Sequence, residues 1–184
     1  MSSSKMATDI HGPATTGSAP VATKIALVAT VCITVAAIVR VVRGELTAGE
    51  TATYLLLFSV LFLLRVAGQV LVVLRAPSWL PPMRQWHLMP YRLLLPIQFG
   101  FLVLMAVIEV GLWRATGPFV DREPGFGRFL IGFSFVYAGA MLLRYAVRMY
   151  RQPRERWFGG AIPIVFHFVL AAFLFTWGKY HVSG

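Results

Sequence analysis

The chain has 184 residues, of which 58% are hydrophobic and 13% are charged, and its mean hydropathy is +0.71. Soluble domains carry about 45–50% apolar and about 25% charged residues, so this composition argues against a water-soluble globule and a disordered chain. The net charge is +10, but the Lys and Arg residues stand between long apolar runs, as in membrane proteins, and form no nucleic-acid-reading element. The single cysteine, Cys32, permits no internal disulfide.

The N-terminal part of the chain predicts a tail followed by a first membrane span. Residues 1–22 are rich in Ser, Thr, Gly, Ala and Pro and have no apolar period, which favours a flexible polar tail. The apolar run at about residues 25–42 is longer than a signal-peptide core and closes on Arg40 and Arg43 instead of a small-residue cleavage site. We therefore expect this run to be retained as a span.

Four further apolar runs are each long enough to cross a hydrocarbon core of about 30 Å at about 1.5 Å per residue. They cover about residues 52–74, 93–113, 129–147 and 158–177. The Thr47–Glu50 spacing matches a capping box just before the second run. Since a lipid-exposed segment must satisfy its own backbone polar groups, the sequence predicts an all-α integral membrane protein. We expect a five-transmembrane-helix bundle, formed by residues 23–184 as a single domain.

The distribution of basic residues predicts the orientation. Nine Lys and Arg fall on the membrane side of the N-terminus and six on the other side. The positive-inside rule then places the N-terminus in the cytoplasm and the C-terminus outside, in a bacterial-type plasma (cell inner) membrane. A basic cluster beside the fourth span is expected to bind anionic lipid headgroups. Its members are Arg148, Arg151, Arg154 and Arg156.

Polar side chains inside the spans predict a pocket in the cytoplasmic leaflet. Arg65 and His167 each lie nine residues from the cytoplasmic end of their span, roughly 13–14 Å deep at helical rise. Gln69 and Gln98 each lie five residues in, roughly 7–8 Å deep. Because an ionisable group inside the bilayer is costly, we expect these four residues to line one ligand-binding pocket. Glu109 lies nearer the opposite surface, too far for an easy pair with Arg65.

The connector at residues 77–92 combines four prolines with several aromatic residues. It cannot form one continuous helix and is too apolar for a solvated loop, so we expect it in the interface or folded against the bundle. His87 and Tyr91 would then stand at the mouth of the pocket. The alternative is a Trp-rich interfacial anchor whose histidine faces headgroups.

Proline and small residues predict details of helix packing. Pro163, placed six residues into the fifth span, frees the carbonyl of Gly159 and is expected to bend the helix. Two stripes of small residues predict close contact, either within the bundle or with an outside partner. They are Ala22, Ala26, Thr30 and Thr34 in the first span, and Gly132, Gly139 and Ala146 in the fourth.

No catalytic or metal-binding motif stands out, because the chain has only two aspartates and lacks phosphate-binding, dinucleotide and nucleophile-elbow signatures. We therefore expect a non-enzymatic accessory or assembly subunit of a membrane complex, with a membrane-protein partner or further copies of itself. Its pocket would hold a lipid, a quinone or a similar amphipathic ligand. One alternative is a haem or quinone redox protein or enzyme, in which His87 and His167 would supply axial nitrogens. A second is a small anion-conducting oligomer.

Overall fold

The computed structural model describes residues 21–75, 80, 91–151 and 161–183, and all regular structure in these ranges is helical. The five helices are α1 (Val21–Arg43), α2 (Ala48–Arg75), α3 (Tyr91–Arg114), α4 (Pro124–Arg151) and α5 (Ala161–Val182). Each is long and apolar enough to cross a membrane, which confirms the predicted five-helix membrane bundle. The predicted tail lies outside the described residues, except that α1 already includes its last two positions.

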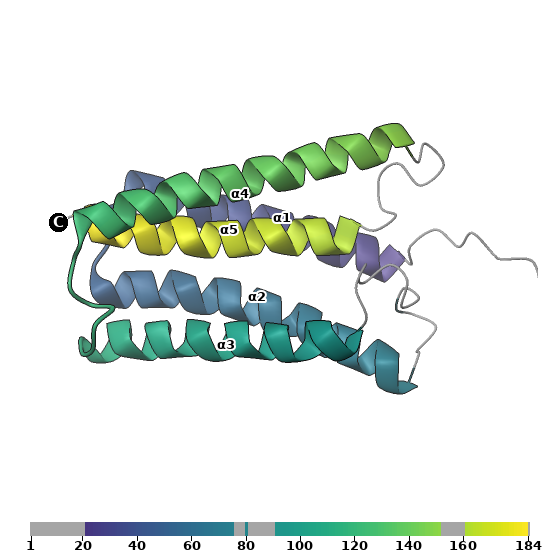
Figure 1. Cartoon of the computed structure of the whole chain (residues 1–184), viewed down its shortest axis with the longest axis horizontal. Helices are drawn as coiled ribbons and strands as arrows, with labels where there is room; N and C mark the ends of the chain where they lie inside the picture. Colours follow the sequence, from purple (N-terminus) through teal and green to yellow (C-terminus); the bar gives the residue numbers. More distant parts are fainter. Residues whose placement is uncertain (1–20, 76–79, 81–90, 152–160, 184) are drawn as a thin grey trace, which may run out of the picture.

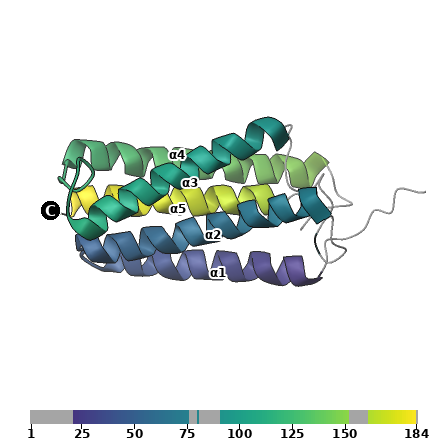
Figure 2. The same ribbon diagram turned by 90° about the horizontal axis from the view of Figure 1, so that it is seen from below.

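Successive helices run antiparallel, so α1 begins at one end of the bundle and the C-terminus lies at the other (Figures 1 and 2). The apolar helix α5 is the most buried and packs against α4, α2 and α1. Helix α2 also packs along α3. As a result α3 packs mainly against α2, and α4 packs mainly against α5. These two outer helices border the same face of the bundle.

The helix ends follow local chemistry that the sequence only partly predicts. The capping box is confirmed, since Glu50 Oε2 accepts from the Thr47 backbone N–H at 3.0 Å and Thr47 Oγ1 accepts from the Glu50 N–H at 3.2 Å. Helix α5 continues five residues beyond the predicted end at residue 177. It does so because Tyr180 and His181 are buried against the segment that joins α3 to α4.

Helices α4 and α5 approach each other closely at a pair of glycines that the sequence does not mark as partners. A Cβ at Gly127 of α4 would lie 2.7 Å from the backbone oxygen of Gly178 of α5, and one at Gly178 would lie 2.9 Å from the oxygen of Gly127. By contrast, Gly132 and Gly139 are exposed, with open space where a Cβ would stand. Of the two alternatives left open for the α4 stripe, the structure does not support packing within the bundle, and contact with an outside partner stays a prediction. In the α1 stripe only Thr30 and Thr34 are buried.

Three chain segments are tied together at the end of the bundle where the C-terminus lies. Arg122, in the α3–α4 connection, donates from Nη1 to the Ser183 carbonyl at 2.7 Å and from Nη2 to the Leu46 carbonyl at 3.0 Å. Its guanidinium carbon also stands 4.7 Å from the centroid of the Tyr180 ring, whose hydroxyl donates to the Val120 carbonyl at 2.8 Å. One side chain thus joins the α1–α2 turn, the α3–α4 connection and the C-terminal segment.

Candidate functional site

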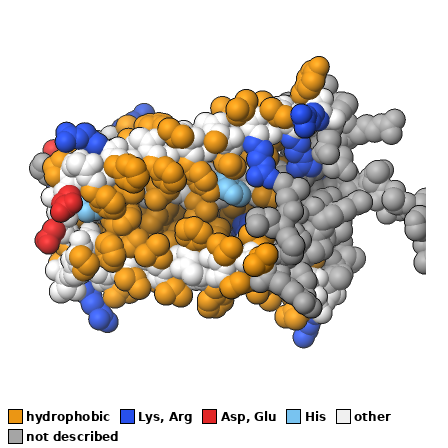
Figure 3. Space-filling model, in the orientation of Figure 1, with side chains coloured by type: hydrophobic (Ala, Val, Ile, Leu, Met, Phe, Trp, Pro, Cys, Tyr) orange, Lys and Arg blue, Asp and Glu red, His pale blue; other side chains and the backbone are white. Residues whose placement is uncertain are grey.

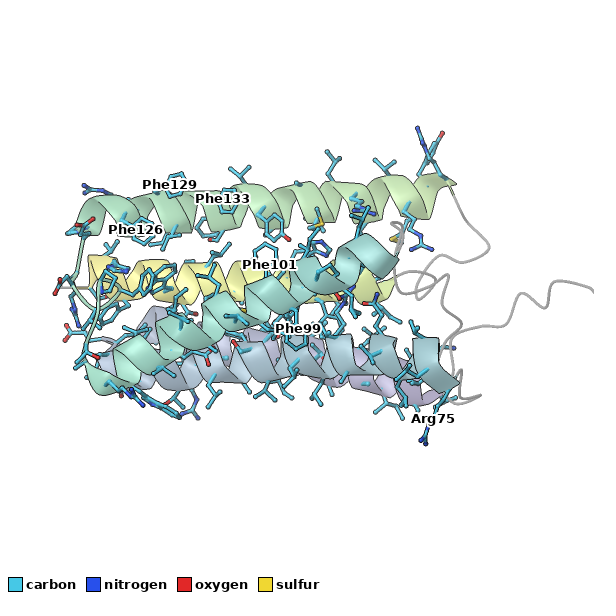
Figure 4. The ribbon with its side chains drawn as sticks, turned by 60° about the horizontal axis from the view of Figure 1, so that its bottom comes forward. Arg75, Phe99, Phe101, Phe126, Phe129 and Phe133 are labelled. Carbon is cyan, nitrogen blue, oxygen red and sulfur yellow. The ribbon has the colours of Figure 1, made fainter. Side chains whose placement is uncertain are left out.

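A cavity of about 440 Å³ lies between α3 and α4, with α2 and α5 contributing to its lining; we call it the α3–α4 cavity. It exists because α3 and α4 each pack on a different inner helix and leave the space between them open. Figure 3 looks onto this face, which is largely apolar, with a histidine and basic side chains toward its right-hand end. The aromatic rings that line the cavity, apart from those of Tyr and His, belong to Phe62, Phe101, Phe133, Phe166, Phe173 and Trp177. In Figure 4, Phe133 of α4 and Phe101 of α3 lie on facing sides of this space.

Four polar side chains from four helices line the same cavity: Arg65 of α2, Gln98 of α3, Tyr137 of α4 and His167 of α5. We call them the polar group. Three of its members are residues for which the sequence predicts a shared pocket. The fourth predicted residue, Gln69, does not line the cavity, but its Oε1 accepts from Arg65 Nη1 at 3.5 Å.

Tyr137 is the member of the polar group that sequence reasoning missed. It stands two helical turns before Arg144 on one side of α4, and that spacing is visible in the sequence. Its ring centroid lies 5.8 Å from that of His167. Two features of the sequence could therefore have assigned Tyr137 to the pocket. It shares a face of α4 with Arg144, and His167 lies deep in the neighbouring span.

Arg65 is buried, with 6% of its surface exposed, and lies among aromatic rings. Its guanidinium carbon is 6.0 Å from the Phe62 ring centroid and 5.9 Å from that of Phe166, so both rings lie within the range of a cation–π contact. Arg65 also lines a second cavity of about 420 Å³ between α1, α2 and α5. The Arg65 side chain thus lines two cavities whose other lining residues are mostly apolar.

The protonation of the His167 ring follows from its hydrogen bond. Nδ1 is bonded to the backbone carbonyl of Pro163, one turn earlier in α5. A carbonyl oxygen only accepts, so Nδ1 carries the hydrogen, and in the neutral ring Nε2 is left as an acceptor. Pro163 itself lies in the first turn of α5 as described, where a missing N–H removes no intrahelical bond. The predicted bend depended on Gly159, which lies outside the described residues.

The side chain of Gln98 is 4% exposed, and its Oε1 has no hydrogen-bond partner among the described residues. A buried amide oxygen without a donor costs about 1–3 kcal/mol. Since Gln98 lines the cavity, a ligand that supplies a donor there would remove this cost. This is the feature of the site that most directly points to a bound molecule.

Several predicted site residues cannot be placed. His87, Arg154 and Arg156 lie outside the described residues, as does most of the connector expected to cover the pocket. Tyr91 begins α3, but its side chain is not described. Arg151, in the last turn of α4, is exposed.

Arg148 is half-buried in the last turn of α4, one turn beyond the exposed Arg144. The described basic residues therefore continue along α4 from the level of the polar group toward the end of the helix. Headgroup binding by this cluster stays a prediction.

The carboxylate of Glu109 has a hydrogen-bond partner other than Arg65. Its carboxylate accepts a hydrogen bond from the Ser59 hydroxyl of α2, and both side chains are buried. This contact joins α2 to α3 on the far side of the cavity from its polar group. The acid in α3 thus serves helix packing.

The Ser59–Glu109 contact predicts a non-additive effect on stability. Ser59→Ala is expected to lower the free energy of unfolding by about 1–3 kcal/mol, because it leaves the buried carboxyl without this donor. Combining it with Glu109→Leu should restore much of that loss, since neither polar group then remains. Unfolding in mixed micelles measures the cycle, with Ser134→Ala as control because the Ser134 hydroxyl donates within its own helix, to the Ile131 carbonyl at 2.7 Å. Strictly additive losses would contradict this interpretation.

Within the part of the chain that the structure describes, no three His, Cys, Asp or Glu side chains gather as a metal site. Comparison with known proteins finds no family model that matches the chain and no curated protein or solved structure that is similar to it.

Proposed function

We propose that the chain is a non-enzymatic accessory or assembly subunit of a membrane complex and holds an amphipathic ligand, a lipid or a quinone, in the α3–α4 cavity. The observation that carries the proposal is the convergence of the polar group, from four helices, on one otherwise apolar cavity. Buried polar groups in a membrane are costly and tend to mark ligand sites.

The dimensions of the cavity support an amphipathic occupant. Its volume of about 440 Å³ falls within the range of about 300–1,000 Å³ that is usual for small-molecule sites. His167 and Trp177 both line it and are ten residues apart on α5, so the apolar part extends about 15 Å from the polar group at helical rise. A polar head at Arg65 and an apolar tail toward Trp177 would match both ends.

The proposal also assigns a membrane and an orientation. The polar group lies toward the end of the bundle where α1 begins, and the basic residues of the α4 C-terminus lie at the same end. The positive-inside rule supports a cytoplasmic position for that end, in a plasma membrane. The outer faces of α3 and α4 expose apolar side chains, which supports contact with lipid or with helices of a partner.

Arg65→Leu tests the ligand site. The full chain is purified in mild detergent, and retained amphiphiles are identified by native mass spectrometry and organic extraction. The retained amount is expected to fall at least about fivefold, equivalent to about 1 kcal/mol. The matched control is Arg75→Leu, because Arg75 is exposed at the end of the same helix and points away from the bundle (Figure 4).

A second pair of variants distinguishes loss of ligand binding from loss of the fold. Phe133 lines the α3–α4 cavity, whereas Phe135, two residues along α4, lines a groove between α1 and α4. Phe133→Ala should therefore lower ligand retention and Phe135→Ala should not.

Two results would overturn the ligand proposal. The wild type would retain and take up no amphiphile, or Arg65→Leu and Phe133→Ala would retain as much as their controls. The same spectra report associated subunits, and a chain that stays monomeric and alone in gentle extraction would remove the accessory-subunit part.

A further inference from the structure

We infer that the α3–α4 cavity takes a hydroxylated aromatic ring on an apolar tail, a quinol, and binds this reduced form more tightly than the oxidised quinone. The inference rests on the proposed ligand site and specifies its chemistry. It follows from the acceptors, the donor and the rings of the residues that line the cavity.

Two acceptors from different helices belong to the polar group. Gln98 of α3 has a buried Oε1 without a partner among the described residues. His167 of α5 has Nδ1 committed to the Pro163 carbonyl, which leaves the lone pair of Nε2. Either atom can accept a hydrogen bond from a ligand donor. A carboxylate or phosphodiester head has only acceptors and supplies no such donor.

The polar group also contains a donor. The guanidinium of Arg65 has five N–H donors and no acceptor, so it favours a ligand oxygen that can accept. A hydroxyl group both donates and accepts, and a quinol carries two of them. A quinone carbonyl accepts a hydrogen bond from Arg65, but it has no hydrogen to donate to Gln98 Oε1 or His167 Nε2. The reduced ring therefore satisfies groups that the oxidised ring leaves unpaired.

The lining favours an aromatic ring over a saturated one. Beside the polar group, Phe62 and Phe166 flank Arg65, and the Tyr137 ring lies next to that of His167. Flat rings gain edge-to-face and offset-stacked contacts with such side chains beyond the area that they bury. The apolar remainder of the cavity, toward Trp177, suits the tail.

The test compares three ring probes on the full chain in lipid nanodiscs, under anaerobic conditions, by equilibrium dialysis with mass-spectrometric quantitation. They are a short-chain benzoquinone, its quinol and the dimethyl ether of that quinol, which keeps the aromatic ring but has no donor. The quinol is expected to bind roughly 10- to 100-fold more tightly than the other two, because buried acceptors left unpaired cost about that factor. Gln98→Leu and His167→Phe should each reduce this preference, while Phe135→Ala should keep it.

The outcomes separate this inference from the proposed function. Equal or tighter binding of the quinone or the ether overturns the inference. Retention of a phospholipid or fatty acid with no binding of any ring probe also overturns it, yet leaves the proposed ligand site standing. Failure to bind any amphiphile removes both. Since Gln98→Leu removes a buried amide that lacks a partner for its oxygen, it should not weaken the fold, and a loss of preference in that variant reports on binding.

Discussion

Gly178→Ala is expected to destabilise the bundle by about 1–3 kcal/mol, because the added methyl group meets a backbone oxygen as well as two side chains of α4. The new Cβ would stand 2.9 Å from the Gly127 carbonyl oxygen and 3.0 Å from atoms of Leu130 and Ile131. Overpacking of this kind typically costs about 1–3 kcal/mol, even though alanine is the better helix former by about 1 kcal/mol. Gly127→Ala should have a similar effect, since its Cβ would lie 2.7 Å from the Gly178 oxygen.

The matched control is Gly132→Ala, on the same helix as Gly127 and with nothing within 4 Å of the new Cβ. That variant should be neutral or slightly more stable. Thermal unfolding in detergent, followed by circular dichroism, measures all three. A Gly178→Ala protein as stable as the Gly132→Ala protein would mean that α4 and α5 do not cross at the glycine pair.

Arg122→Leu is expected to lower the free energy of unfolding by about 2–3 kcal/mol. It removes charge-assisted hydrogen bonds to the carbonyls of Leu46 and Ser183, together with the stacking on Tyr180. Hydrogen bonds to charged groups contribute about 1.5–3 kcal/mol each when buried, and the exposure of the Arg122 side chain reduces their joint contribution to about 2–3 kcal/mol. Limited proteolysis should also cleave the α3–α4 connection faster, because its anchor to the other two segments is lost.

The control for this variant is Arg128→Leu, an exposed arginine in the first turns of α4 at the same end of the bundle. It removes the same charge without removing the contacts to Leu46 and Ser183. Stability and proteolysis should therefore stay near wild type. If both variants lose the same free energy of unfolding, the effect of Arg122→Leu comes from the change in net charge and not from the lost hydrogen bonds.

Residue counting along the chain predicts the helices and much of the polar group. Arg65, Gln98 and His167 could be placed in the same leaflet because helical rise is constant, and depth needs no knowledge of which way a helix faces. Tyr137 was not assigned to the pocket because its membership depends on how α4 is rotated against α5. Gln69 was assigned to the pocket on depth, but it lies beside Arg65 and not on the cavity wall.

Features that depend on the packing of one helix against another escaped prediction. Gly127 and Gly178 are 51 positions apart, and nothing local marks them as partners, whereas the regular spacing of Gly132 and Gly139 drew attention to a face that points outward. The tautomer of His167 required the hydrogen bond to Pro163, which sequence reasoning had linked only to a bend. Spacing predicts which residues share a face, but not which face another helix covers.

Helix α4 stands close to α5 near its first turns, at the glycine pair, and diverges from it toward the opposite end (Figure 1). The α3–α4 cavity lies on the side of the bundle, on the largely apolar face that Figure 3 shows. A hydrophobic guest would then arrive by lateral diffusion after dissolving in the bilayer, so its occupancy would depend on its mole fraction among the lipids. Dilution of the aqueous phase at a fixed guest-to-lipid ratio should leave that occupancy unchanged for a strongly partitioning guest.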